Sequence, residues 1–375
     1  MKQHIPLILS AIALLSPCLP AQGWEKLCEG VSVDASVYDF GDILLGSGPV
    51  SCRFTLRNDS GKSLLIDRVT TSCGCTNAQW STGPVAAGKT GDISVVYKND
   101  EGAFPFEKSL TVWLSCNERP VYLKIRGVCH AKPVVLEEVY TQQIDEQGVL
   151  AVKSREIKCG TLEQGGERSE CFLVANLSQK EASLSFTQLP PQVRMAAAAI
   201  TAPARQTVRV DFSVRADEQL WGKNWYEIRP VVNGRSVSTP LRIWTVTQMN
   251  TSALSKEEKR SGARVSFKNS TVAAGKIKQG GRIEAEFRFS NTSQKDFILH
   301  KIDTDPEGVT CTLRSGGKEG ETGAYPVVAA GQDGILRAVI DTSQLPKGEM
   351  LVSLRLVTNS PLRPLIDLFV SGWVE

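Results

Sequence analysis

Histidine is nearly absent from this sequence, with three residues in 375. His4 lies in the N-terminal leader, so only His130 and His300 remain to do chemistry. Histidine exchanges protons near neutral pH and is a frequent metal ligand. Most catalytic and metal sites that depend on several histidines are therefore excluded. Nucleophile motifs, phosphate-binding glycine loops and His-Glu metal motifs are also missing. We therefore expect a chain that is not an enzyme and that uses no cofactor and no metal.

An excess of charge of one sign is missing as well. The sequence has 43 basic and 40 acidic residues, which gives a formal net charge of +3. This near balance provides no basic stripe for nucleic acid. The carboxylates are scattered evenly, as on a solvated surface. We therefore expect no nucleic-acid partner.

A hydrophobic run long enough to span a bilayer is also missing. An apolar run at residues 5–15 follows Lys2 and precedes small residues that end at Ala21. This order is typical of a secretory signal peptide at residues 1–21. A lipid anchor on Cys18 is the alternative, which Pro17 disfavours. We therefore expect an extracytoplasmic protein that is periplasmic, secreted or associated with the outer membrane, without a transmembrane helix.

One β-strand pattern occurs three times. It begins at Phe54, Phe172 and Phe287, a spacing of roughly 115 residues, which is the size of an immunoglobulin-like sandwich. Each copy ends in two alternating segments that predict a hairpin, at 110–115 with 121–127, 226–232 with 236–246, and 351–358 with 365–372. Apart from a short solvated helix expected at 255–260, no helical period is sustained.

The pattern therefore predicts an all-β chain of three tandem immunoglobulin-like β-sandwich domains. We expect them at residues 25–130, 131–248 and 263–375, with a linker at 249–262.

An asparagine follows the phenylalanine-bearing strand of every copy. Asn58, Asn176 and Asn291 each precede a serine by two residues, as in a glycosylation sequon. The alternative is that the side chains hydrogen-bond a tight turn. Repetition at one structural position favours the turn.

The first copy has further motifs in a fixed order. Tyr38-Asp39-Phe40-Gly41, Ser72-Cys73-Gly74-Cys75-Thr76 and 108–112 follow one another. This series resembles the bacterial domain-of-unknown-function family 1573, over roughly residues 36–128, and more distantly the hydin-type and major-sperm-protein folds. The resemblance implies an immunoglobulin-like fold and export, as in exported proteins of the Bacteroidota, but no activity, substrate or catalytic residue. The second copy lacks the Cys-Gly-Cys motif, and the third keeps only Cys311-Thr312.

Cys73 and Cys75 are the sharpest candidate site. Two thiols that flank a glycine suit a short disulfide with redox activity, or a soft metal. Zinc would need further ligands, for which Cys116, Cys129 and His130 are the candidates. The structural alternative, which we favour, places one thiol in the core and bridges the other to a neighbouring strand.

A second cysteine pair predicts a disulfide. Cys159 and Cys171 lie symmetrically about Gly165-Gly166, a turn between two segments with strand patterns. Facing positions on a hairpin lie within bridging distance, so we expect these two residues to form a disulfide.

Trp221, Trp225 and Tyr226 are the candidate binding aromatics. Such side chains stack on sugars, anchor a protein partner, or pack between adjacent domains. We therefore predict a non-catalytic scaffold, adhesion or binding protein of a bacterial envelope, whose partner is an envelope protein or glycan. The alternatives are a thiol redox or metal-binding protein that acts through Cys73 and Cys75 and, less favoured, a carbohydrate-binding protein.

Overall fold

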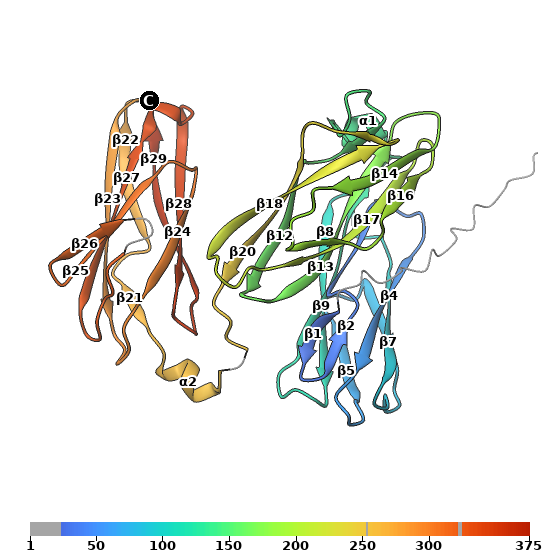
Figure 1. Ribbon diagram of the computed structural model, residues 1–375, viewed down its shortest axis with the longest axis horizontal. Coiled ribbons are helices and arrows are strands. Elements are labelled where there is room, and N and C mark those ends of the chain that lie inside the picture. The colour runs from blue at the N-terminus through green and yellow to red at the C-terminus, as the bar shows by residue number, and fades with distance from the viewer. Residues whose placement is uncertain (1–23, 253, 322–324) are drawn as a thin grey trace, which may run out of the picture.

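The computed structural model describes residues 24–252, 254–321 and 325–375. The predicted signal peptide at 1–21, including Cys18, lies outside these described residues. Within them the chain is almost entirely β-strand, which confirms the all-β prediction (Figure 1). The described strands form six sheets, which pack in pairs around separate hydrophobic cores and give three sandwich units.

The first unit packs a five-stranded sheet on a four-stranded sheet. The larger sheet has the order β1 (Glu25–Cys28), β2 (Val31–Val33), β4 (Val50–Asn58), β7 (Lys89–Tyr97) and β6 (Thr76–Trp80). The smaller has the order β3 (Val37–Leu44), β9 (Val121–His130), β8 (Pro105–Leu114) and β5 (Ile66–Thr71). Leu110, Val112 and Leu114 of β8 alternate into the core, as a period of two requires.

The second unit repeats this plan after the short helix α1 (Leu136–Val139). One sheet has the order β10 (Gln142–Gln143), β11 (Leu150–Val152), β13 (Glu167–Asn176), β17 (Thr207–Arg215) and β15 (Val193–Met195). The other has the order β12 (Glu156–Glu163), β20 (Leu241–Gln248), β18 (Gly222–Val232), β14 (Ala182–Thr187) and β16 (Ala199–Ala202), and β19 (Arg235–Ser236) pairs with β18.

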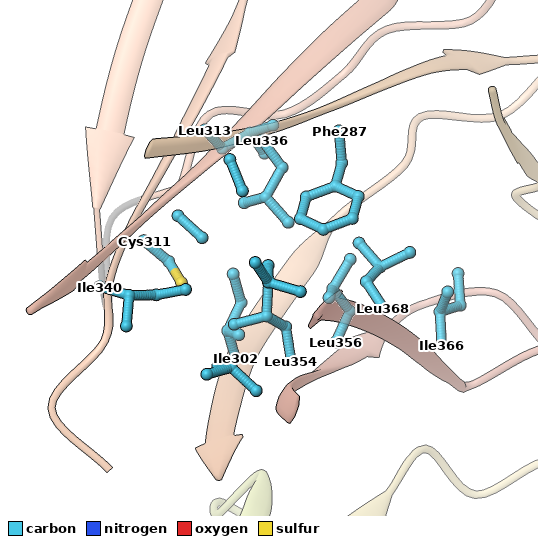
Figure 2. Close-up of a cluster of buried hydrophobic side chains, with 14 of the residues drawn as sticks. Phe287, Ile302, Cys311, Leu313, Leu336, Ile340, Leu354, Leu356, Ile366 and Leu368 are labelled. Atoms are coloured by element: carbon cyan, nitrogen blue, oxygen red, sulfur yellow. The ribbon is translucent and has the colours of Figure 1, made fainter. Parts of the chain in front are cut away.

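The third unit follows helix α2 (Lys256–Ser261) and is set apart in Figure 1. One sheet has the order β21 (Val265–Phe267), β23 (Arg282–Asn291), β27 (Asp333–Asp341), β25 (Thr310–Ser315) and β26 (Lys318–Glu321). The other has the order β22 (Thr271–Ile277), β29 (Leu365–Val374), β28 (Gly348–Thr358) and β24 (Leu299–Asp305); a 3-10 turn, η1, covers Thr342–Gln344. Phe287 and Leu336 of one sheet face Leu354 and Leu368 of the other across the core (Figure 2).

The three predicted hairpins are present. β8 pairs with β9, β18 with β20, and β28 with β29, all antiparallel. The sheet that contains the hairpin also has one parallel pair in each unit: β3 with β9, β12 with β20, and β22 with β29. The short helix expected at 255–260 is also confirmed, as α2. Ser255 is its N-cap. The Ser255 Oγ accepts a hydrogen bond from the Glu258 N–H, and the Glu258 carboxylate accepts one from the Ser255 N–H.

The repeated asparagine forms the same turn in all three units. Asn58, Asn176 and Asn291 are fully or almost fully buried. Each Nδ2 donates to the carbonyl four residues on and to a carbonyl of a distant segment, at 2.7–2.9 Å. Each Oδ1 accepts the N–H and the hydroxyl of the serine two residues on. The prediction of turn chemistry is therefore confirmed.

The predicted disulfide between Cys159 and Cys171 is wrong. Both residues are buried thiols. Although a turn at Gly165-Gly166 joins them, β12 enters the sheet of β20, whereas β13 enters the facing sheet between β11 and β17. The turn is thus a crossover between sheets and not a hairpin, so the two cysteines are not cross-strand neighbours.

Candidate functional site

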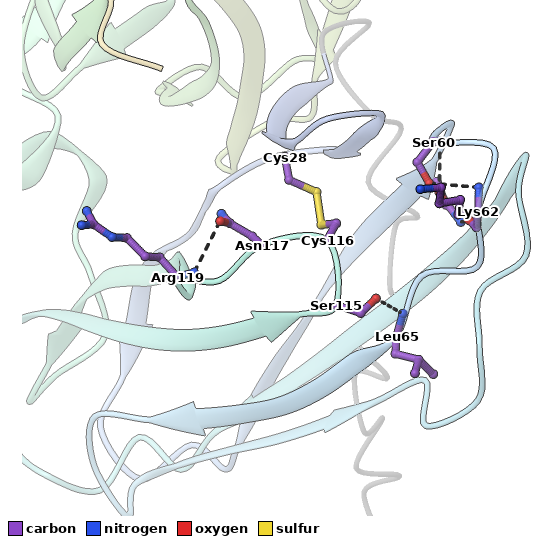
Figure 3. The surroundings of a disulfide bond; sticks show 9 residues. Cys28, Ser60, Lys62, Leu65, Ser115, Cys116, Asn117 and Arg119 are labelled. Carbon is purple, nitrogen blue, oxygen red and sulfur yellow. Dashed lines mark hydrogen bonds between the residues drawn. A yellow bond between two sulfur atoms is a disulfide. The ribbon is translucent and has the colours of Figure 1, made fainter. Parts of the chain in front are cut away.

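The two disulfides of the described chain both lie in the first unit. Cys28 at the end of β1 bonds to Cys116 in the turn after β8, across 88 residues (Figure 3). The other joins Cys73 to Cys75, two residues apart. The predicted bridge from this motif to a neighbouring strand is therefore wrong, and the short-loop disulfide of the redox alternative is present.

The Cys73–Cys75 disulfide lies where the chain changes sheets. β5 is an edge strand of the smaller sheet and β6 an edge strand of the larger one, so residues 72–75 cross the side of the sandwich. The Thr71 hydroxyl donates to the Cys73 carbonyl at 3.1 Å, and the Lys98 N–H donates to the Cys75 carbonyl at 2.9 Å. These bonds attach the crossover to β5 and to the segment after β7.

Polar groups surround the two sulfur atoms. The Thr76 hydroxyl lies 3.4 Å from Cys73 Sγ and 3.6 Å from Cys75 Sγ. A Glu101 carboxylate oxygen lies within 4.8 Å of both sulfurs, and Lys108 Nζ contacts the Glu101 carboxylate at 2.5 Å. Two thiolates and a carboxylate are the donors that this site would offer a soft metal after reduction.

The further zinc ligands considered from the sequence are engaged elsewhere. Cys116 is in the other disulfide, the Cys129 thiol donates to Asn99 Oδ1 at 3.1 Å, and His130 Nε2 contacts Asp42 at 2.7 Å. Burial raises the pKa of the Cys129 thiol, which makes its thiolate a less available ligand. The fold therefore does not gather these residues around Cys73 and Cys75.

The candidate aromatics separate into different environments. The Trp221 indole stacks on the His300 ring of the third unit, with 3.8 Å between centroids and 7° between planes. Tyr226 is buried in the core of the second unit. Trp225 is 37% exposed and is the most exposed of the three.

Trp225 shares its face of the sheet with a second tryptophan that sequence reasoning missed. Trp244 on β20 pairs with Trp225 on β18, and their centroids are 6.1 Å apart. Lys223 Nζ lies 4.6 Å and 5.4 Å from the two ring centroids, and Lys158 lies 5.9 Å from that of Trp244. The alternation of buried Leu241 and Ile243 with Arg242 and Trp244 was the sequence signal, because it places Trp244 on the outer face. We call Trp225 and Trp244 with these lysines the tryptophan face.

A cluster of polar side chains joins the first two units. Asp42, whose side chain is 7% exposed, accepts hydrogen bonds from Tyr140 Oη at 2.6 Å and Lys153 Nζ at 2.6 Å, and it contacts His130 Nε2. Burial disfavours the ionised carboxyl, but the hydrogen bonds from Lys153, Tyr140 and His130 outweigh it and lower the pKa of Asp42. We call these four residues the Asp42 cluster.

Further buried charges lie beside this cluster. Arg126 of the first unit bonds to Asp39 at 2.8 Å and to Glu170 of the second unit at 3.2 Å. Burial opposes the charge of Arg126, but attraction to Glu170 and Asp39 raises the pKa of its guanidinium. Glu25 accepts the Ser36 and Ser169 N–H groups at 2.9 Å and 3.1 Å, one from each unit.

A cavity of about 490 Å³ lies between the first two units. Phe106, Val128, Val152 and Leu173 line its apolar part, and Cys171 lies in its wall. The charged groups at its edge, such as Arg126 and Lys153, are already paired with carboxylates. The cavity therefore belongs to the contact between the units.

The second and third units also contact each other. The Lys223 N–H donates to Asp303 at 2.6 Å, and Lys301 Nζ donates to the Lys223 carbonyl at 2.8 Å. Together with the stacked Trp221 and His300, these bonds place the start of β18 against β24.

Among the described residues, no helix is long and apolar enough to cross a bilayer.

Comparison with solved structures finds distant likenesses. A protein of unknown function from Porphyromonas gingivalis W83 is 15% identical, covers 60% of this chain and 99% of its own, and has a TM-score of 0.49. The CupB2 chaperone of Pseudomonas aeruginosa is 9% identical, covers 58% and 98%, and has a TM-score of 0.21. A PapD-like domain of human CEP192 is 8% identical, covers 31% and 87%, and has a TM-score of 0.21.

No curated protein is similar in sequence to this chain. Its first unit, in contrast, matches a family model. Residues 31–129, which include the Cys-Gly-Cys crossover, match the family described as protein of unknown function, DUF1573. The resemblance predicted from Ser-Cys-Gly-Cys-Thr and its neighbouring motifs is therefore confirmed, and over residues 31–129 this chain is similar to the DUF1573 family.

Proposed function

We propose that this chain is a non-catalytic, extracytoplasmic β-scaffold of a bacterial envelope. In this proposal the first two units form one rigid arm that presents binding surfaces to an envelope protein or glycan. The observation that carries the proposal is the Asp42 cluster, in which one buried carboxylate is held by groups from both units and the segment between them.

Buried charges of this kind favour one arrangement over others. An ionised group taken from water is costly unless its partners are placed correctly. Any other orientation of the two units would take Lys153 away from Asp42 and Arg126 away from the buried Glu170. Glu25 of the first unit also accepts one N–H from each unit, from Ser36 and from Ser169. A fixed spacing between surfaces is what a scaffold requires, whereas a flexible tether would join the units through solvated residues.

The rigidity is tested by measuring distances between the first two units. Spin labels on non-natural side chains at the exposed positions Asn77 and Gln179 leave the native cysteines in place. We expect one narrow distance distribution in the wild-type protein and a broader one after Asp42→Ala. The change Asp303→Ala, at the contact with the third unit, is the matched control and should leave the distribution unchanged. A broad distribution in the wild-type protein would contradict the rigid arm.

Export is tested by recovering the protein from fractionated cells. We expect it in a periplasmic, secreted or outer-membrane fraction, with an N-terminal peptide that begins after Ala21 or carries a lipid on Cys18. A full-length chain recovered from the cytoplasm would contradict the proposal.

Carbohydrate binding is a second candidate, which the tryptophan face favours. Two indole rings on one face of the sheet, tilted by 57° to each other, offer surfaces for sugar rings. The cations beside them, Lys158, Lys223 and Arg242, suit acidic groups. Affinity electrophoresis through polygalacturonate should retard the wild-type protein, and Trp225→Ala should reduce this retardation. Trp113, which stacks with Arg68 at 3.9 Å in the first unit, provides the control variant Trp113→Ala. Equal retardation of both variants and the wild-type protein would exclude this face.

A further inference from the structure

The two cysteines of the Cys73–Cys75 disulfide differ in burial. Cys75 is 8% exposed and packs in the core of the first unit, whereas Cys73 is only partly buried. Between them, Gly74 is exposed, and a Cβ added to it would meet no atom within 4 Å. An incoming thiolate can therefore approach Cys73 past a residue without a side chain, whereas Cys75 packs in the core.

The Thr76 hydroxyl is placed to stabilise either sulfur of the disulfide when that sulfur leaves. Thiol–disulfide exchange proceeds along the S–S axis, and the leaving sulfur departs as a thiolate. Attack on Cys73 makes Cys75 the leaving group, and the Thr76 hydroxyl, 3.6 Å from Cys75 Sγ, is placed to donate a hydrogen bond to it. The same hydroxyl lies 3.4 Å from Cys73 Sγ, so it can follow the charge when Cys73 leaves in a second step.

The fold depends little on this disulfide. It closes a loop across a sequence separation of 2, whereas Cys28–Cys116 closes one across 88. A disulfide stabilises a protein mainly by restricting the unfolded chain, and a short loop restricts it least. The crossover also has its own backbone bonds from Thr71 and Lys98. The Cys73–Cys75 bond can therefore open and close while the sandwich stays folded, whereas the folding free energy holds Cys28–Cys116 closed.

We propose that Cys73 and Cys75 form a thiol–disulfide exchange site that oxidises a pair of cysteines in an exported protein. Cys73 is the attacked sulfur and Cys75 is the leaving thiol. The inference goes beyond the scaffold function and does not depend on it.

The exchange takes two steps. A partner thiolate attacks Cys73 Sγ, which forms a mixed disulfide, breaks the Cys73–Cys75 bond and releases Cys75 as a thiolate that takes a proton from solvent. The second thiolate of the partner then attacks the partner sulfur of the mixed disulfide and releases Cys73, which is also protonated. The partner dithiol is thereby oxidised to a disulfide, and two electrons and two protons reduce Cys73 and Cys75 to thiols.

The attacked sulfur is identified with reduced glutathione as the probe. The oxidised full-length protein is treated at pH 7, quenched with acid, alkylated and digested, and fragment masses on either side of Gly74 locate the glutathione. We expect at least a tenfold excess of adduct on Cys73 over adduct on Cys75. An equal distribution, an excess on Cys75, or no adduct on either residue would overturn the assignment.

The exchange is measured with a reduced peptide that contains two cysteines. One equivalent of protein should oxidise about one equivalent of peptide, and the thiols of Cys73 and Cys75 should then become available for alkylation. The double variant Cys73→Ala/Cys75→Ala should leave the peptide reduced. The double variant Cys28→Ala/Cys116→Ala, if it folds, keeps the site and should retain the reaction. No oxidation by the wild-type protein would overturn the proposed site.

A redox titration separates the two disulfides of the wild-type protein, without any variant. In glutathione buffers we expect Cys73–Cys75 to be half reduced at a reducing strength, [GSH]²/[GSSG], at least tenfold lower than Cys28–Cys116 requires. Mass mapping of the alkylated peptides measures the reduced fraction of both disulfides in one sample. If Cys28–Cys116 is reduced first, Cys73–Cys75 is the structural bond and the proposal fails.

Discussion

At the scale of single residues, three buried asparagines close three equivalent turns. Their phenylalanine-bearing strands could be aligned from the sequence. The asparagine side chain can donate two hydrogen bonds and accept two, which suits a turn that is bonded to another segment of the chain. The same residue-scale reasoning could not assign Asp42. Its three hydrogen-bond partners lie 88, 98 and 111 residues away in the chain, so no local pattern marks it.

Replacement of Asn58 by alanine should destabilise the first unit. The change removes the two bonds that Asn58 donates and the two that it accepts from Ser60, at a cost of about 2–4 kcal/mol. Hydrogen exchange of the β4 and β7 amides, read by mass spectrometry, reports this loss locally. Asn77→Ala on the exposed face of β6 is the control and should change protection little. Equal protection in both variants would contradict the role of Asn58.

At the scale of elements, the strands followed from the sequence but their sheets did not. The alternation in 110–115 and the turn residues after it predict β8 and β9 and their pairing. The same reasoning fails for β12 and β13, which have a similar turn between them but enter opposite sheets. A period of two indicates which residues share a face, and it contains no information on which sheet completes the core.

The two disulfides should differ in their effect on the first unit. In the chain-entropy account, a loop of the Cys28–Cys116 size contributes about 4–5 kcal/mol, and one of three residues contributes less than about 2 kcal/mol. We therefore expect Cys28→Ala/Cys116→Ala to lower the melting temperature of this unit far more than Cys73→Ala/Cys75→Ala. Calorimetry of the full chain measures both variants. A larger loss in the second variant would show that the crossover depends on its bond.

At the scale of the whole molecule, the contacts between units contain the buried charges. Burial raises the pKa of Glu25, so the ionised carboxylate is a cost at neutral pH that is relieved as the pH falls through this raised pKa. The pKa of Asp42 is lowered, so its stabilisation is present above the ordinary aspartate pKa and is lost only as the pH falls below that range. Two carboxylates at one contact therefore respond to pH in opposite directions.

Amide substitutions should reveal this difference. At pH 7 we expect Asp42→Asn to destabilise the arrangement of the first two units by about 1–3 kcal/mol, since it removes the charge that Lys153 contacts. Glu25→Gln keeps an oxygen that accepts from Ser36 and Ser169, and it should be neutral or stabilising at pH 7. Thermal unfolding at pH 7 and pH 5 tests both; a loss at pH 7 in Glu25→Gln as large as in Asp42→Asn would contradict the assignment.

The contact between the second and third units should be sensitive to Gly222. Its φ is +64°, and an added Cβ would lie 2.4 Å from Asp303 Oδ2 and 2.9 Å from the Lys301 side chain. Gly222→Ala should therefore displace the Asp303 and Lys301 side chains and loosen the contact between the units while their cores stay folded. Small-angle scattering should show a larger radius of gyration, and Gly234→Ala, where nothing lies within 4 Å of the added Cβ, should not change it. An unchanged radius in Gly222→Ala would show that the units do not depend on this approach.

The sequence by itself determined the strands, the three repeated units, their asparagine turns and the similarity of residues 31–129 to the DUF1573 family. These features depend on side-chain period and turn chemistry, which are local along the chain. Only the tertiary structure decided that Cys73 bonds to Cys75 while Cys159 and Cys171 remain thiols, that Trp221 stacks on His300, and that Asp42 joins two units. Those outcomes depend on which sheet each strand enters and on which charges are buried together, and both are set by packing between segments far apart in sequence.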